Sequence, residues 1–181
     1  MGDLNIINPV AILKDIEESC RSCAVGLPHK AEVSNEWSGI AFRLDGNSLL
    51  VPMDQVVEIL DYPILSAVPL TQPWLRGIAN IRGNLLPVID LNGYLGNALT
   101  QVTDKTRVLV IDYEGLYSGL VVDEVMGLKH FLDEEYTEDG IEVGALLHPY
   151  TGYGYRRNGQ VWGVFSVFAL ADSQQFLQAA V

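Results

Sequence analysis

The sequence predicts an all-β domain with flanking helices, and two observations support this. From Trp37 onward, short apolar runs separated by turn residues recur about every 8–12 residues, which is the pattern of a β-barrel or sandwich. Several runs face each other across turn-forming dipeptides such as Asp45-Gly46 and Asn158-Gly159, which favour hairpins. The length of 181 residues allows one large domain or two small packed ones, without need of a disulfide or metal.

The first part of the chain differs from the rest, because it carries a helical pattern. Asn8-Pro9 is typical of a helix start, and apolar residues then recur at helical spacing. We expect an amphipathic helix from Pro9 to Val25, ended by Gly26 and Pro28. The polar stretch that follows is predicted to be a linker, so the predicted division is residues 1–36 and residues 37–181. The apolar face of this helix comprises Val10, Leu13, Ile16, Cys20 and Cys23.

Cys20 and Cys23 form a C-x-x-C pair, which alone fits half of a zinc site or a redox pair. A zinc site needs two more ligands, and the three histidines show no ligand spacing. Because a spacing of three places both thiols on the apolar helix face, packing as small hydrophobic residues is the favoured interpretation.

The strands are expected in pairs along the chain. Residues 40–44 and 49–51 flank Asp45-Gly46, and residues 56–60 continue that strand pattern. The later pairs are residues 78–82 with 85–91, residues 108–112 with 116–122, and residues 153–157 with 160–165. A final apolar stretch, Val167 to Ala180, is predicted to be a helix.

The strands before and after about residue 100 look like two sets, with Asn97 to Asp104 as the crossing between them. The second half also holds an acidic run at residues 133–142, which is interpreted as a solvated loop. The region from Asp133 to Tyr155 carries little motif and is a candidate insertion.

The charge balance excludes several classes of function. Lys and Arg number 11 against 23 Asp and Glu, so the formal net charge is −12. This charge argues against binding to nucleic acid or to an anionic membrane surface. No stretch approaches the roughly 20 apolar residues of a membrane span, and Met1 to Val10 lacks the features of a secretory signal. A cytoplasmic location without direct membrane insertion is therefore expected.

Catalytic motifs are absent from the sequence. No phosphate-binding loop, nucleophile elbow or zinc-protease motif occurs, so neither catalysis nor a cofactor is expected. Asp90, Asp112 and Asp123 near strand ends could form an acid–base pair, but such aspartates commonly accept hydrogen bonds from turn amides.

The segment Gly77–Leu91, which reads GIANIRGNLLPVIDL, is the most informative part of the chain. It predicts two strands joined by a tight turn, with Pro87 on an edge or at a bulge. Arg82 is expected to project from the hairpin end. One interpretation pairs it with a local acid such as Asp90, and the other makes it a protein-binding arginine beside an exposed strand edge.

This segment resembles the signature of the CheW family, the adaptor proteins of bacterial chemosensory arrays. Three further segments are similar to family motifs in the same order: residues 50–60, residues 68–77 and residues 119–125. The N-terminal helix and the Glu36-Trp37-Ser38-Gly39 entry are most similar to members that serve type IV pilus twitching systems.

The resemblance implies a CheW-like fold of two five-stranded β-barrel-like (SH3/OB-like) subdomains around a shared core. It also implies a non-catalytic adaptor that couples the cytoplasmic tip of a methyl-accepting chemoreceptor to the regulatory domain of a CheA-type histidine kinase. Arg107 stands where relatives often have an aliphatic contact residue. The implied partner-binding positions are Val56, Glu58, Asn80, Arg82, Gly83 and Arg107.

Three other functions are alternatives to this adaptor role. One is a coupling protein of a flagellar chemotaxis pathway. Another is a β-barrel enzyme, which needs a pocket with titratable groups of perturbed pKa. The third is an oligonucleotide-binding barrel, which needs basic and aromatic residues on one face and is disfavoured by the net charge.

Overall fold

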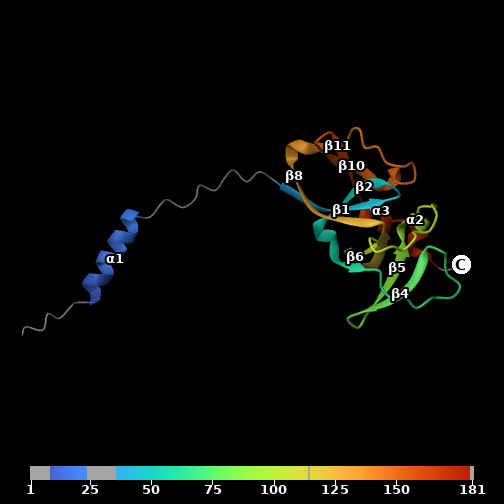
Figure 1. Cartoon of the computed structure of the whole chain (residues 1–181), viewed down its shortest axis with the longest axis horizontal. Coiled ribbons are helices and arrows are strands. Elements are labelled where there is room, and N and C mark those ends of the chain that lie inside the picture. The colour runs from blue at the N-terminus through green and yellow to red at the C-terminus, as the bar shows by residue number, and fades with distance from the viewer. Residues whose placement is uncertain (1–8, 24–35, 114, 180–181) are drawn as a thin grey trace, which may run out of the picture. The chain divides into compact units, whose positions relative to one another are not determined.

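The computed structural model describes residues 9–23, 36–113 and 115–179 (Figure 1). The chain divides into two compact units, Met1–Ser34 and Asn35–Val181, and each is described by itself. The first unit contains helix α1 (Pro9–Cys23), and the second contains all the strands.

Helix α1 forms where the sequence predicts it, and the predicted last turn at Ala24 and Val25 lies outside the described residues. The side chains of Leu13 and Ile16 on its apolar face are exposed. Cys20 is a free cysteine that is exposed within its own unit, and the packing of its thiol against an apolar surface stays a prediction. The Cys23 side chain lies outside the described residues.

Two sheets make up the β domain, which confirms the all-β fold class. The first sheet has the order β8 (Glu124–Leu132), β1 (Glu36–Leu44), β2 (Asn47–Pro52), β11 (Gln160–Phe165), β10 (Thr151–Arg157) and β9 (Tyr136–Thr137). The second has the order β3 (Val56–Asp61), β6 (Arg107–Tyr113), β7 (Leu116–Val122), β5 (Asn84–Asp90) and β4 (Leu75–Ile81). The sixth strand of the first sheet, β9, is only two residues long.

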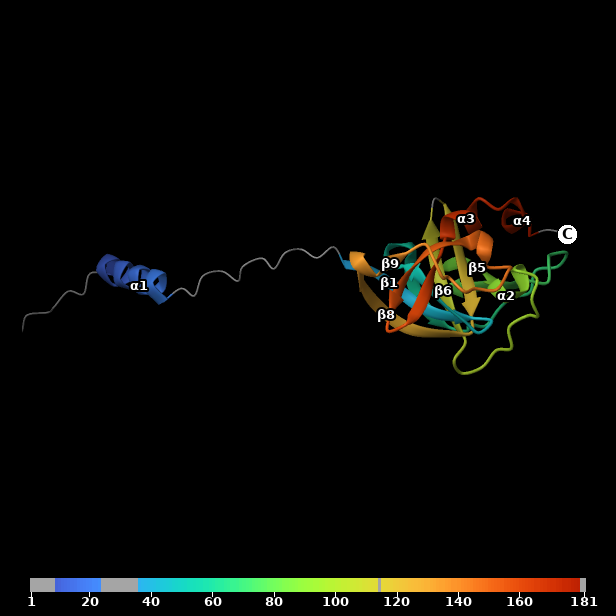
Figure 2. The same cartoon turned by 90° about the horizontal axis from the view of Figure 1, so that it is seen from above.

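Short helices connect or follow the strands. They are η1 (Met53–Gln55), α2 (Leu91–Tyr94), η2 (Asp133–Glu135), η3 (His148–Tyr150), α3 (Val167–Ala171) and α4 (Gln174–Leu177). Figure 2 shows α3 and α4 near each other at the C-terminal end of the domain.

The predicted division of the strands at about residue 100 is wrong. The chain leaves the first sheet through η1 after β2, completes the whole second sheet, and returns after β7. Residues 97–104 therefore connect elements of one sheet. Two parallel pairs, β2 with β11 and β5 with β7, join strands that are distant in sequence. Hairpin signals report only neighbouring strands, so they do not reveal such pairs.

Three apolar clusters hold the β domain together. Strand β6 shows the arrangement, because Val108 and Val110 pack inside the second sheet while Leu109 and Ile111 face a cluster to which both sheets contribute. A third cluster, with Phe131 and Tyr155, lies within the first sheet. Each sheet thus encloses its own small core around a shared one, as the barrel-like fold class requires.

Pro87 lies on β5, an interior strand of the sheet, but at a position where one side of this strand is locally an edge, as predicted. At this point β5 is paired only with β4, through Ile78, and the ladder with β7 begins at Val88. The missing N–H of proline therefore leaves no ladder bond unmade.

The acidic run is more ordered than the predicted solvated loop. Its first residues form η2 and β9, and β9 pairs with β10. The carboxylate of Glu135 accepts hydrogen bonds from Arg157 and, at 2.8 Å, from the backbone N–H of Leu132. Arg157 in turn lies over the ring of Phe131, 4.6 Å from its centroid. These contacts fasten the connection between β8 and β9 to β10.

The C-terminal stretch forms two short helices, α3 and α4, instead of the single predicted helix. The break at Asp172-Ser173 places Ser173 beside the Tyr94 hydroxyl, which donates to Ser173 Oγ at 2.7 Å. It also places Phe176 in a stack against Trp74 with centroids 6.2 Å apart. Burial raises the pKa of Tyr94 to about 12, since the buried site disfavours the charged phenolate.

The strand-end aspartates have structural partners. Buried Asp90 accepts hydrogen bonds from the backbone N–H groups of Thr100 (2.8 Å) and Gly93 (3.2 Å). Asp123 accepts from the backbone N–H of Asp45 at 2.8 Å. The turn-amide interpretation is confirmed for these two residues, whereas Asp112 is exposed on β6.

Candidate partner-binding site

Strand β3 forms one edge of the five-stranded sheet and presents apolar side chains to solvent. Val56 at its start is half-buried and packs against the shared core, which fixes the position of the strand. The side chains of Val57 and Ile59 are 61% and 41% exposed. Glu58, between them in sequence, is only partly exposed, because side chains alternate between the two faces of a strand.

The turn of the hairpin formed by β4 and β5 carries the predicted arginine, Arg82, and Figure 1 labels the two strands. Ile81 pairs with Asn84, so Arg82 and Gly83 form a two-residue turn, and both have positive φ, 52° and 91°. This combination is typical of the tight turns that match strand twist. The side-chain oxygen of Asn80 accepts a hydrogen bond from the Gly83 N–H at 2.9 Å and supports the turn. The motif residues Asn80, Arg82 and Gly83 therefore shape one hairpin tip.

Arg82 and Glu58 meet across the two edges of the sheet. Arg82 Nη2 lies 2.7 Å from Glu58 Oε1, although the arginine side chain is 79% exposed. Arg82 therefore projects from the hairpin end as predicted, but its carboxylate partner is Glu58 and not Asp90. The two edges are also joined by backbone, because Ser66, in the segment after β3, bridges to Ile78 on β4.

Arg107 lies apart from this pair. It stands at the start of β6 opposite Asp61, three residues before the position that faces Glu58. Its guanidinium contacts Asp61 Oδ1 at 3.3 Å and donates to the backbone carbonyls of Asp104 and Thr106 at 2.7 and 2.8 Å. These bonds turn the side chain toward its own strand and the preceding turn.

Exposed aliphatic residues on the same strand edge and hairpin as the ion pair were missed by the sequence prediction. Besides Val57 and Ile59, Leu85 is 68% exposed and follows the hairpin turn directly. The signal was present in the sequence, because residues 56–60 (VVEIL) place apolar side chains on both faces of a strand. On an edge strand one of those faces reaches solvent.

The chemistry of this site suits binding rather than catalysis. It consists of one exposed ion pair, exposed aliphatic side chains and a strand edge, the components of a protein contact. Within the described residues, no group of three or more His, Cys, Asp or Glu is placed to hold a metal ion.

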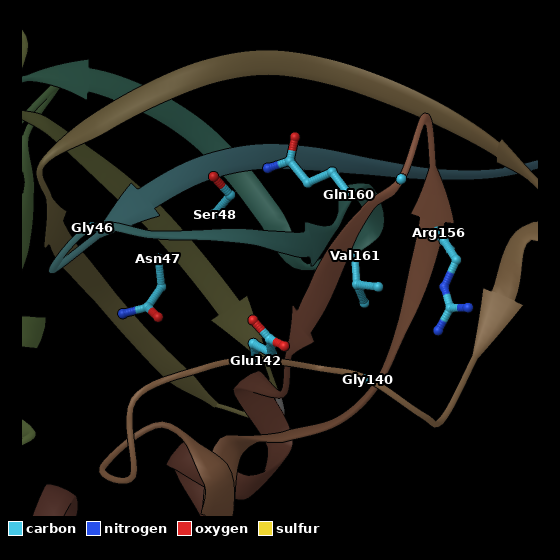
Figure 3. A pocket seen from close by; sticks show the side chains of 9 residues that line it. Gly46, Asn47, Ser48, Gly140, Glu142, Arg156, Gln160 and Val161 are labelled. Atoms are coloured by element: carbon cyan, nitrogen blue, oxygen red, sulfur yellow. The ribbon is translucent and has the colours of Figure 1, made fainter.

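A hollow of about 700 Å³ in the described β domain lies elsewhere (Figure 3). It is bounded by the β1–β2 turn, β11 and the segment carrying Glu142, and it contains none of the predicted site residues. Figure 3 shows Arg156 beside this hollow on β10.

The fold and the site together define a β-domain protein with an exposed ion pair and a strand edge that are suited to contacts with other proteins. Sequence comparison supplies the family. The CheW-like domain family matches residues 38–175. The chain belongs to the CheW-like family, and is thereby a non-catalytic scaffold of chemosensory systems.

Individual relatives agree with this assignment. Protein PilI of Pseudomonas aeruginosa is 40% identical over 177 residues, covering 98% of this chain and 99% of PilI. The chemotaxis protein CheW of Bacillus subtilis is 33% identical over 114 residues, 62% of this chain and 73% of that protein. The scaffolding protein TtCheW of Thermoanaerobacter tengcongensis has the same fold, with a TM-score of 0.66 at 19% identity over 77% of this chain and 94% of that one.

Proposed function

We propose that this protein couples a methyl-accepting chemoreceptor to a CheA-type histidine kinase in a system that controls type IV pilus twitching motility. The proposal places the protein in the cytoplasm, at receptor arrays near the inner membrane. Its pilus assignment is supported by the similarity to PilI, which extends over nearly the full length of both chains, the N-terminal part included. Among the described residues, no helix has the length and apolar character that crossing a membrane requires.

One observation supports the proposed binding surface above all others: the Arg82–Glu58 pair. Its arginine is too exposed for the pair to contribute much to folding, since exposed ion pairs typically stabilise a protein by about 0–1 kcal/mol. An exposed guanidinium keeps donors available for a carboxylate of a partner. The exposed Val57 and Ile59 flank Glu58 on β3 and supply apolar contact area. Val56, Asn80 and Gly83 hold the strand and the turn in position.

The test is the binding of the Arg82→Glu variant to the purified kinase regulatory domain and to the receptor tip. We expect a loss of about 30-fold to several thousandfold for at least one partner, because a reversed charge leaves the partner's carboxylate unpaired. The free energy of unfolding should change by only about 0.5 kcal/mol, as for other exposed positions.

Arg43→Glu is the matched control. Arg43 is also an exposed arginine paired with a glutamate, Glu124 at 3.5 Å, but it lies on the other sheet. This control should bind normally. The double variant Arg82→Glu with Glu58→Arg restores an ion pair in reversed order. Normal binding by the double variant would mean that the ion pair only shapes the hairpin and does not contact a partner. A wild-type protein that binds neither the kinase domain nor the receptor tip would overturn the proposed function itself.

A further inference from the structure

We propose that the free edge of β8 binds an extended acidic peptide segment of a partner protein, with an acidic side chain placed against Lys129. This surface lies on the six-stranded sheet, whereas the Arg82–Glu58 pair lies on the other. The inference therefore goes beyond the kinase and receptor contacts proposed above.

Lys129 is unusual among the cations of the β domain. Within residues 36–113 and 115–179, six of the eight Lys and Arg side chains pair with a carboxylate, and the exceptions are Lys129 and Arg156. The Lys129 ammonium instead lies over the ring of Trp162, 5.0 Å from its centroid. In a chain of net charge −12, with acids in excess, a half-buried lysine without a carboxylate is open to an external one.

The backbone at Lys129 is also available for pairing. Strand β8 pairs with β1 on one side, where Lys129 faces Gly39, and it stands at the edge of the sheet on the other. The strand at the opposite edge of this sheet is β9. It pairs with β10 at only two positions, so it is too short to pair along β8 and close the sheet. An edge strand leaves every other residue's N–H and C=O without a neighbouring strand, and extended peptides bind such edges by adding a strand.

The space beside β8 is large enough for peptide side chains, and aromatic and cationic residues line it. A hollow of about 380 Å³ lies between β8 and the hairpin of β10 and β11. Phe131 and Trp162 give it aromatic walls, and Arg157 adds a second cation whose charge is already matched by Glu135. A glutamate or aspartate opposite Lys129 would form the cross-strand pair of opposite charges that stabilises neighbouring strands. Charge complementarity thus selects an acidic segment.

The experiment measures the binding of a fluorescent peptide, Glu-Val-Glu-Val-Glu, to the full chain. Its matched comparison is Gln-Val-Gln-Val-Gln, which has the same alternation without charge. We expect the acidic peptide to bind more tightly. Lys129→Gln should weaken its binding about fivefold, the factor that corresponds to one cross-strand charge pair. Arg156→Gln is the control variant, since it removes the other cation without a carboxylate partner, which does not line this hollow.

Nuclear magnetic resonance of the labelled protein adds a structural readout. Strand addition predicts shifts of the β8 backbone amides and of the Trp162 indole. Four results would each overturn the proposal: no binding at millimolar peptide, equal loss in the two variants, unmoved β8 amides, or equally tight binding of free glutamate or inorganic phosphate. Lys129→Glu gives an independent check, because it should reverse the preference toward Lys-Val-Lys-Val-Lys.

Discussion

Gly77 lies where two backbone segments come too close for a side chain. Ser66 and Ile78 form a bridge with both N–H to O distances at 2.9 Å, and Gly77 directly precedes it with φ of 142°. A Cβ added at Gly77 would stand 2.5 Å from the carbonyl oxygen of Ser66. The bridge joins the segment after β3 to β4, so this glycine helps to hold the Glu58 and Arg82 strands beside each other.

Gly77→Ala should therefore destabilise the protein by about 2 kcal/mol or more, since both the positive φ and the clash with backbone are unfavourable. Urea unfolding monitored by circular dichroism measures this. Gly46→Ala is the control, because Gly46 has φ of 77° but open space around it, and its expected cost is only the conformational one, about 1 kcal/mol. Equal costs for the two variants would contradict the close-approach argument.

At the residue scale, the sequence predicted the exposure of the Arg82 side chain better than it predicted the carboxylate that pairs with it. The turn dipeptide at Arg82-Gly83 was sufficient to predict a projecting arginine. Its partner, Glu58, is 24 residues away on the opposite edge of the sheet, and only closure of that sheet brings the two together. Asp90 is nearer in sequence, but it is buried and engaged by Thr100, Gly93 and Arg76.

At the element scale, local signals and long-range pairings behave differently. Asn158-Gly159 predicted its hairpin correctly, because both residues adopt the positive φ values, 53° and 78°, that such turns require. The assignment of strands to sheets failed, because it depends on pairs between strands that are distant in sequence: the antiparallel pairs β1–β8 and β3–β6 and the parallel pairs β2–β11 and β5–β7. Parallel neighbours are joined by long connections, so no turn between them marks the pairing.

The connection between β8 and β9 depends on a charged pair, and its stability should depend on pH. The hydrogen bonds from Arg157 hold the pKa of Glu135 below its ordinary value of about 4.5. Because the folded-state pKa is lowered, the stabilisation is present above the unfolded-state pKa and is lost as the pH falls through the folded-state value. The wild-type protein should therefore be more stable than Glu135→Gln at pH 7, and the difference should shrink in acid.

Thermal unfolding of both proteins between pH 7 and pH 3 measures this difference. Glu134→Gln is the control, because Glu134 is the exposed neighbour of Glu135 in η2. It should follow the wild-type pH dependence. A Glu135→Gln curve that runs parallel to the wild-type curve at every pH would contradict the role given to this carboxylate.

At the scale of the whole molecule, the three apolar clusters account for the stability of the β domain. The shared cluster receives residues from both sheets, so neither sheet buries its apolar surface alone. Their described members all belong to Trp37 and later residues. The predicted boundary at Trp37 depends on the change in apolar periodicity there, which is a local property. The sequence could not predict how the two sheets share a core.

Removal of residues 1–35 should therefore leave a folded, cooperative β domain. The expected thermal midpoint lies within about 4 °C of that of the full chain, equivalent to about 1 kcal/mol, because no described core contact is removed. Circular dichroism and calorimetry measure the fold and the midpoint. Removal of residues 1–28 is the companion variant, since it keeps the stretch before β1 and reports any fraying of Glu36, which pairs with Leu132 at the sheet edge. Both truncated proteins should unfold in a single transition, and if both are unfolded at 25 °C the boundary at residue 36 is wrong.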